Sequence, residues 1–278
     1  MSEPHALPAG HLDIARDLRA LGLERGDGVM VHGALSALGP TLAGPRSVIE
    51  GLVEAVGPAG LVVMPAFTAD SVLPPLPPDL PDHARAHLEA QVPGFDPARS
   101  SASRLGALAE AFRSWPGVVR SVHPIRSLAA LGPEAGRMLE RHPRDWPLGL
   151  DGPMGRLAER QDMKVLLLGV GYDRCSALHT AETIATCRRL CVRHFKDTRH
   201  APPRWVHARD VGDDAEGYFP DLGAAFDRTG SVRHGRVAGG EARLFALCDL
   251  LAFAAPWLTT RNNAARPVMR TRRDGEAS

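Results

Sequence analysis

The feature that most limits the fold is the apolar run MKVLLLGV at residues 163–170, which leads directly into a segment with helical spacing. A short apolar run ending at Gly is typical of a buried core strand. Elsewhere in the chain, short apolar runs alternate with helical patterns in the same way. This alternation predicts an α/β protein built in layers.

The remaining elements follow from hydrophobic spacing and from Gly and Pro breaks. Helices are predicted at 11–23, 47–56, 104–115 and 244–258. Strands are predicted at 28–32, 60–66, 118–122, 127–132, 191–195, 204–209 and 231–237. Residues 69–103 are rich in Pro, Asp and Ser, and we expect a loop insertion there, either functional or a mobile surface feature. We expect a single domain over 1–265, followed by a disordered basic tail over 266–278.

Composition excludes several classes of function. A net charge of +1 over 278 residues leaves no broad basic face for nucleic acid. The chain has no apolar stretch long enough to span a membrane and no leader-like N-terminus. Its four cysteines lack the paired spacing of a zinc site. We therefore expect a cytoplasmic protein that contacts neither nucleic acid nor membrane.

The strongest chemical signal is the pair His179 and Glu182, which follows the strand at 163–170. In a helix that begins near Ser176, the two side chains lie one turn apart on the same face. A carboxylate beside an imidazole fixes the tautomer of the ring and favours its protonation, as a general base requires. The pair alone is also compatible with helix capping and packing.

Other segments offer weaker candidates. The stretch RSVHPIRS (120–127) groups basic and hydroxyl side chains that suit phosphate. His32 ends the strand at 28–32 and could be a buried neutral residue. The acidic run RDVGDDAEGYF (209–219) could face a cationic ligand or be a solvated loop. A metal site remains an alternative, although no two histidines have the helical spacing of a metallohydrolase.

Four ordered blocks carry a family resemblance. They are GDGVMVHGALSALG (26–39), GLVVMPAFT (60–68), the segment 95–135 that contains SSASRLG and RSVHP, and the segment 145–182 that ends in SALHTAE. Together these blocks resemble the aminoglycoside 3-N-acetyltransferases, a family distinct from the GNAT fold. The resemblance implies the antibiotic N-acetyltransferase fold, a layered α/β/α sandwich around a mixed central sheet.

The resemblance also implies a reaction: direct acetyl transfer from acetyl-CoA to the 3-amino group of a 2-deoxystreptamine ring, which confers antibiotic resistance. His179 would be the general base, Glu182 would steady the imidazolium, and Ser176 would offer a hydroxyl to the developing oxyanion. No metal is expected, and a monomer or a homodimer is compatible with the sequence. The residues expected to contact coenzyme A are His32, Leu35, Ser36, Ser100, Ser101, Ser103, Arg120, Ser121, His123 and Ser127. The cationic acceptor would contact Phe67, Asp173, Asp210, Asp213 and Asp214, with residues 69–97 forming one wall.

The chain departs from the family at two places. Gly33 and Ala34 stand where the family has two serines, which removes two hydroxyls near the coenzyme. Tyr172, Arg174 and Cys175 replace the residues common beside the acceptor. Two alternatives therefore stay open: an acyltransferase of the same fold that acts on a biosynthetic amine, and a metal-dependent hydrolase. A nucleophilic role for Cys175 is a further alternative for the mechanism.

Overall fold

The computed structural model describes residues 7–186, 189–212 and 217–264. Its central feature is a seven-stranded sheet with the order β3-β4-β2-β1-β5-β9-β8. The strands are β1 (Gly28–Gly33), β2 (Leu61–Pro65), β3 (Val119–Arg120), β4 (Leu128–Leu131), β5 (Met163–Leu168), β8 (Arg233–Val237) and β9 (Gly240–Ala246). β1 pairs in parallel with both β2 and β5, and the other pairings are antiparallel. The sheet is therefore mixed, as expected.

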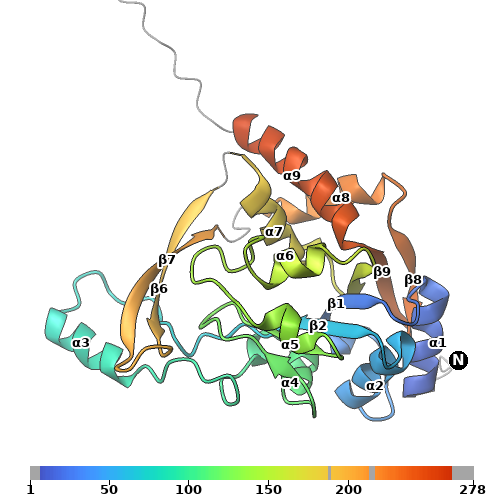
Figure 1. Ribbon diagram of the computed structural model, residues 1–278, viewed down its shortest axis with the longest axis horizontal. Coiled ribbons are helices and arrows are strands. Elements are labelled where there is room, and N and C mark those ends of the chain that lie inside the picture. Colours follow the sequence, from blue (N-terminus) through green and yellow to red (C-terminus); the bar gives the residue numbers. More distant parts are fainter. Residues whose placement is uncertain (1–6, 187–188, 213–216, 265–278) are drawn as a thin grey trace, which may run out of the picture.

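Helices cover both faces of this sheet (Figure 1). One face carries α1 (His11–Leu21), α2 (Pro45–Val56) and α4 (Ala107–Arg113). The other face carries α5 (Ala135–Leu139), α6 (Pro153–Ala158), α7 (Ala177–Ile184), α8 (Phe219–Asp227) and α9 (Leu247–Ala264). The predicted α/β/α sandwich is confirmed.

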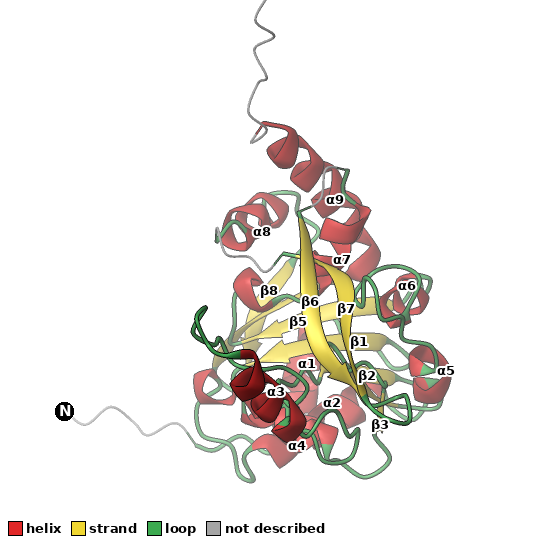
Figure 2. Ribbon diagram, turned by 90° about the vertical axis from the view of Figure 1, so that its left-hand side faces the viewer, coloured by secondary structure: helices red, strands yellow, loops and turns green. Residues whose placement is uncertain are grey.

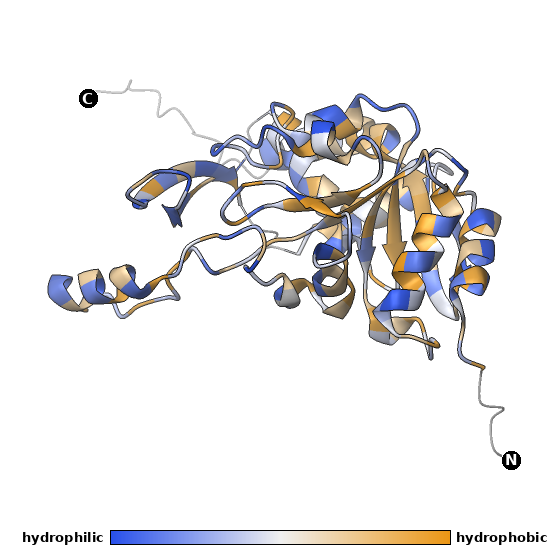
Figure 3. Cartoon of the chain, turned by 60° about the horizontal axis from the view of Figure 1, so that its bottom comes forward, coloured by the Kyte–Doolittle hydropathy of each residue, from blue (hydrophilic) through white to orange (hydrophobic). Residues whose placement is uncertain are grey.

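The central strands bury both of their faces because their side chains alternate between two cores. In β5, Val165 and Leu167 point to the core under α5–α9, whereas Leu166 and Leu168 point to the core under α1, α2 and α4. All four side chains are fully buried. Figure 3 shows the same pattern, with mostly hydrophobic strands between helices that carry hydrophilic residues outward. The continuous apolar sequence of β5 is the consequence of this two-sided burial.

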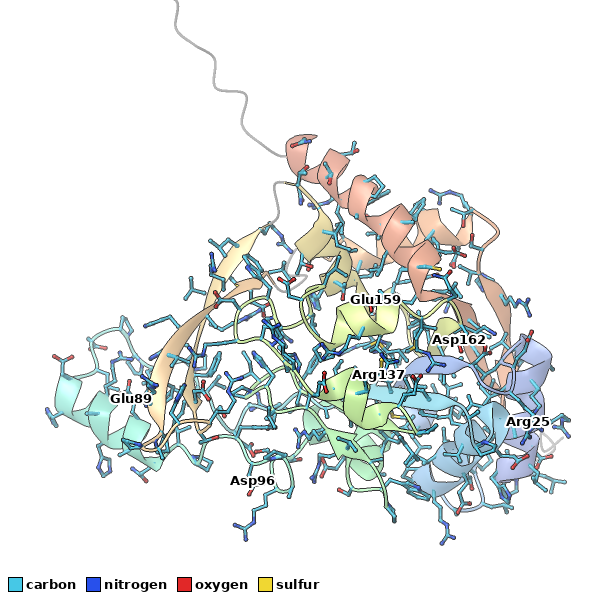
Figure 4. All side chains as sticks on the ribbon, in the orientation of Figure 1. Arg25, Glu89, Asp96, Arg137, Glu159 and Asp162 are labelled. Carbon is cyan, nitrogen blue, oxygen red and sulfur yellow. The ribbon has the colours of Figure 1, made fainter. Side chains whose placement is uncertain are left out.

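A second, two-stranded sheet projects from the sandwich. It consists of β6 (Leu190–Asp197) and β7 (Arg204–Val211), paired antiparallel. The segment expected as a loop contains α3 (Asp82–Gln91), which lies on the same side of the molecule as this hairpin (Figures 1 and 2). Lys196 joins the two by donating to the carbonyl of Val92 at 2.7 Å. Figure 4 shows Glu89 on α3 and Asp96 after it, both away from the central sheet.

The helices predicted at 104–115 and 244–258 both begin later in the structure, for physical reasons. Residues 244–246 belong to β9 rather than to the following helix, because a strand buried on both faces has the same apolar character as a buried helix. The helix predicted from residue 104 begins at Ala107, because Gly106 has a φ of +98° and separates it from a short 3-10 turn, η2 (Ser103–Leu105). Among the described residues, no helix combines the length and apolar character needed to cross a membrane. The predicted tail at 266–278 lies outside the described residues.

Candidate active site

The site is built where three neighbouring parallel strands end. β1, β2 and β5 run in the same direction, so their carboxyl ends meet at one edge of the sheet. His32 in β1 is in register with Leu167 in β5, and Gly33 with Leu168. The chain then passes from β5 through the 3-10 turn η3 (Tyr172–Arg174) into α7. Ligands of open α/β sheets bind at such an edge, where the connections leave the sheet in different directions.

His179 and Glu182 form a hydrogen-bonded pair on α7. Nδ1 of His179 lies 2.7 Å from Oε2 of Glu182. Because an ionised carboxylate only accepts hydrogen bonds, Nδ1 carries the hydrogen and the lone pair of the neutral ring is on Nε2. Glu182 is almost fully buried, whereas about 15% of the His179 side chain is exposed. The buried Glu182 carboxylate therefore holds the His179 ring, whose Nε2 is free to accept a proton.

The second oxygen of Glu182 is also engaged. The Tyr218 hydroxyl donates to Oε1, and Nη2 of Arg189 lies 3.4 Å from the same oxygen. Nη2 of Arg189 also donates to the Tyr218 hydroxyl at 2.8 Å. Sequence reasoning missed both residues, because neither is close to His179 in the chain.

His32 lies at the end of β1 with its Nε2 buried and without a hydrogen-bond partner among the described residues. Burial, together with the nearby charge of His179, lowers the pKa of His32 to about 3. The ring is therefore neutral at physiological pH, and a buried polar atom without a partner costs free energy of folding. Such an atom beside a cavity is available to a ligand.

A cavity of about 780 Å³ opens in front of this edge. Among the residues that line it are His32, Leu35, Ser36, Asp173 and Ser176. Ser176 precedes α7, but its hydroxyl makes no capping hydrogen bond to the helix. The volume is in the range of sites that hold large organic ligands. The structure thus brings these predicted residues together on one cavity.

Gly169 shapes the same cavity from the end of β5. Its φ of +67° is unfavourable for other residues, and a Cβ there would lie 2.5 Å from Cβ of Ala37. The missing side chain lets the end of β5 approach the turn after β1. In that turn, the amide of Ala34 donates to the carbonyl of Leu168 at 3.0 Å.

Cys175 is next to the cavity in sequence but faces the core. It is 1% exposed, and burial raises the pKa of its thiol to about 12. The neutral thiol is a poor nucleophile. This environment argues against the alternative in which Cys175 carries the acyl group.

Three side chains of the segment 120–127, those of Ser121, His123 and Ser127, are turned inward, contrary to the expectation that they point to a ligand. Ser121, His123 and Ser127 are buried, and none of them lines the 780 Å³ cavity. Nε2 of His123 donates to the carbonyl of Arg144, while its Nδ1 accepts from the amide of Arg126. The Ser127 hydroxyl donates to the carbonyl of Ala66 at 2.7 Å. These groups already have protein partners.

Ser121 and Arg120 belong to the same set of internal hydrogen bonds made by residues 120–127, which we call the brace. Nε2 of His142 donates to the carbonyl of Pro147, so its Nδ1 accepts from the Ser121 hydroxyl at 2.8 Å. Arg120 donates to the carbonyls of Pro97, Ser100 and Ala66. Burial lowers the pKa of Arg120 to about 10. The brace ties the chain around residues 97–100 to the large sheet.

The predicted serine cluster is also engaged within the protein where its side chains are described. The Ser100 hydroxyl accepts from the amide of Asp96 at 3.1 Å, and the Ser101 hydroxyl donates to Glu110 at 3.2 Å. Ser103 lies in η2, and its side chain is outside the described part of the structure. Its neighbour Arg104, which the sequence analysis did not select, lines the 780 Å³ cavity.

A second cavity of about 350 Å³ shares Arg104 and Leu105 with the first. Phe67, which is expected to contact the acceptor, is among its lining residues, and Ala69 and Val72 supply part of its wall from the Pro-rich segment. Arg126 and Arg193 line it as well.

The predicted acidic residues do not gather at this second cavity. Asp210 is 2% exposed and pairs with Arg126 at 3.6 Å and with Arg193 at 3.2 Å, so it is an internal counter-ion, contrary to expectation. Asp173 lines the first cavity and pairs with Arg174 at 3.1 Å. Asp213 and Asp214 lie outside the described residues. Within the described ranges, no group of three or more His, Cys, Asp or Glu side chains is arranged to hold a metal ion.

Comparison with known proteins identifies the family. The family described as aminoglycoside 3-N-acetyltransferase matches residues 30–259. The chain is 36% identical to aminoglycoside N(3)-acetyltransferase VIII of Streptomyces fradiae over 91% of this chain and 92% of that protein. The structure of AAC-IIIb in a binary complex with CoASH matches with a TM-score of 0.83 and 33% identity, over 94% of this chain and all of that one.

The structure of AAC-VIa bound to sisomicin matches with a TM-score of 0.81 and 30% identity, over 92% of this chain and 99% of that one. The likeness therefore extends over more than nine-tenths of this chain. It is a full-length likeness to acyltransferases. This chain therefore belongs to the aminoglycoside 3-N-acetyltransferase family.

Proposed function

We propose that this protein transfers an acetyl group from acetyl-CoA to an amino group of an aminoglycoside, with His179 as the general base. The observation that carries the proposal is the 2.7 Å hydrogen bond between His179 Nδ1 and Glu182 Oε2, which leaves Nε2 as a proton acceptor on the helix that follows Ser176 of the 780 Å³ cavity. Relatives solved with CoASH and with sisomicin support the same two substrates here.

The residues around the 780 Å³ cavity suit the donor. Arg104 supplies a positive charge for phosphate groups, and the apolar Leu35 lies on the same wall. His32 and Ser36 would hold the end of the molecule that reaches the sheet edge. When bound, acetyl-CoA supplies the acetyl group as an activated thioester. The brace at 120–127 would keep this wall in place without touching the ligand.

The chain's own groups would then perform three tasks. His179 removes a proton from the attacking ammonium, since a protonated amine has no lone pair. Glu182 stabilises the imidazolium that results. The Ser176 hydroxyl, which has no capping bond, donates to the acetyl oxygen as negative charge develops there. Holding both substrates at one edge supplies much of the remaining acceleration.

The second cavity favours a different acceptor as a second candidate. Arginines 104, 126 and 193 line it, and no acidic residue does so among the residues described. An amine that carries a carboxylate or phosphate group would match this charge, as a biosynthetic acceptor could. Asp210 partly offsets the positive charge of this cavity, because it pairs with Arg126 and Arg193.

The test is release of free thiol from acetyl-CoA, followed with a set of 2-deoxystreptamine aminoglycosides that includes sisomicin, and with amines that bear an anionic group. We expect release with at least one aminoglycoside, with a single acetyl group on the 3-amino nitrogen by mass spectrometry and NMR. His179→Ala should lower turnover at least about a hundredfold. Release with the anionic amines alone would replace the proposed acceptor with the second candidate. A fully active His179→Ala protein would contradict the assignment of the base.

A further inference from the structure

The carboxylate of Glu182 is shared between two sides of the site. Oε2 accepts from His179, and Oε1 accepts from Tyr218 and faces Nη2 of Arg189 at 3.4 Å. The three partners come from separate parts of the chain: His179 from α7, Arg189 from the segment before β6, and Tyr218 from the residue before α8. Glu182 is 3% exposed, so solvent contributes little to its hydrogen bonding.

The direction of the hydrogen bonds is fixed by the chemistry of the partners. Arginine only donates, so the bond of 2.8 Å between Nη2 of Arg189 and the Tyr218 oxygen uses a lone pair of the hydroxyl. The single hydroxyl hydrogen is therefore directed to Glu182. Burial and the neighbouring carboxylate raise the pKa of Tyr218 well above its ordinary value, so the hydroxyl stays protonated.

The aromatic ring of Tyr218 is held as firmly as its hydroxyl. Cζ of Arg189 lies 4.9 Å from the ring centroid, and Cζ of Arg261 in α9 lies 4.1 Å from it. Both guanidinium groups can interact with the ring face. Phe219 follows in the chain, and its ring centroid lies 5.1 Å from that of His179. The start of α8 thus contacts the catalytic pair from two directions.

We propose that Tyr218 and Arg189 are positioning residues that hold Glu182 and, by drawing electron density toward Oε1, limit how strongly Oε2 retains the proton of the His179 imidazolium. The inference rests on the proposed function of His179 as the base. Among the described residues, the charged or titratable groups near the pair include His32 from β1, Arg189, Tyr218 and, behind the Tyr218 ring, Arg261. Tyr218 and Arg189 both contact the carboxylate of Glu182 rather than His179, so each is argued to act through Glu182.

Tyr218→Phe tests the inference because it removes the hydroxyl and keeps the ring for both guanidinium groups. Without the donor at Oε1, Glu182 holds the imidazolium more tightly. The acid limb of the pH profile of kcat should therefore move to higher pH by about half a unit to one unit. The turnover near pH 7 should fall severalfold, while KM for acetyl-CoA stays within about twofold. Arg189→Met should move the limb in the same direction, because it removes a positive charge close to the pair.

Tyr172→Phe is the matched control. Tyr172 is the other tyrosine of the chain, and its buried hydroxyl donates to Asp227 at 2.6 Å. Tyr172→Phe loses a hydrogen bond to a carboxylate in the same way, but that carboxylate is Asp227 and not Glu182, so the pH profile should stay unchanged. If Tyr218→Phe does not fold, Arg189→Met decides by the same measurement.

A readout without turnover separates this inference from the proposed function. The ring titration of His179 is followed by NMR in the protein without substrates and is assigned by its absence in His179→Gln. A higher midpoint in Tyr218→Phe supports the positioning role even if no aminoglycoside is acetylated. A His179 titration midpoint that is unmoved or lower in both Tyr218→Phe and Arg189→Met overturns the positioning role. The two residues would then contribute only stability, as Tyr172 does.

Discussion

His32 and His179 are neighbouring imidazoles with opposite hydrogen-bonding states: Nδ1 of His179 is bonded to Glu182, whereas Nε2 of His32 is buried and has no hydrogen-bond partner in the described part of the structure. The two rings are close enough for the charge of His179 to contribute to lowering the pKa of His32. One imidazole is prepared to accept a proton, and the other stays neutral. A site that needs one base and one uncharged donor would use two histidines in this way.

Glu182→Gln should weaken the base without changing its shape. Loss of the carboxylate charge removes stabilisation of the imidazolium, so turnover should fall and the acid limb of the pH profile should move to lower pH. This shift is opposite in sign to that expected for Tyr218→Phe. Steady-state rates from pH 5 to 9 check both effects. Normal turnover with an unchanged profile would leave Glu182 a structural role only.

His32→Leu should lower activity without lowering stability. The substitution removes a buried polar atom that has no partner within residues 7–186, 189–212 and 217–264, so the free energy of unfolding should not decrease, while kcat/KM for acetyl-CoA should fall at least about tenfold. Urea unfolding and steady-state kinetics on the same preparation provide the two measurements.

His142→Leu is the matched control for that change. His142 is equally buried, but both ring nitrogens have partners in Ser121 and Pro147. Loss of the ring should lower the free energy of unfolding by about 2 kcal/mol, because the Ser121 hydroxyl and the Pro147 carbonyl each lose a hydrogen-bond partner. The kinetic constants of the folded fraction should stay near those of the wild type. A destabilised but kinetically normal His32→Leu protein would make His32 an ordinary core residue.

Cys175→Ala should retain acetyl transfer. Burial keeps the pKa of the thiol at about 12, so the thiolate needed for nucleophilic attack is scarce at pH 7. We expect turnover within a few-fold of wild type and no acetylated protein by mass spectrometry after mixing with acetyl-CoA. Loss of turnover accompanied by an acetyl adduct on the wild-type thiol would instead support covalent transfer.

The protein should lose stability in mild acid because of its buried histidines. Burial lowers the pKa of His32 to about 3, that of His142 to about 4, and that of His123 well below its ordinary value. The unfolded chain takes up these protons below pH about 6.5, whereas the folded protein does not. The stabilisation is therefore fully present above pH about 6.5 and is lost as the pH falls toward 4.

Each such histidine should contribute a slope of up to about 1.4 kcal/mol per pH unit to the free energy of unfolding between these limits. Urea unfolding at pH 7, 6 and 5 measures the slope. His142→Asn should reduce it by about the share of one histidine. A slope that is the same in the variant would show that His142 does not contribute.

The sequence alone determined the elements whose signals are local. The alternation of short apolar runs and helical patterns sufficed to predict the α/β layers. The run at 163–170 predicted β5, because burial on both faces favours apolar residues at successive positions, here 165–168. The spacing of His179 and Glu182 placed them one helical turn apart, since that distance depends only on α-helix geometry. Local spacing could not distinguish β9 from the start of α9, because both contribute closely spaced apolar residues to the core.

Only the tertiary structure decided which polar groups meet. The segment 120–127 resembles a phosphate site in sequence, yet its Ser121, His123 and Ser127 side chains turn inward. They form hydrogen bonds with His142 and with the carbonyls of Arg144 and Ala66, respectively. Tyr218 and Arg189 reach Glu182 from positions 36 and 7 residues further along the chain. The physical reason is the same in both cases. The chemical type of a side chain determines which hydrogen bonds it can make. The packing of distant elements determines whether those hydrogen bonds are made within the protein or left for a ligand.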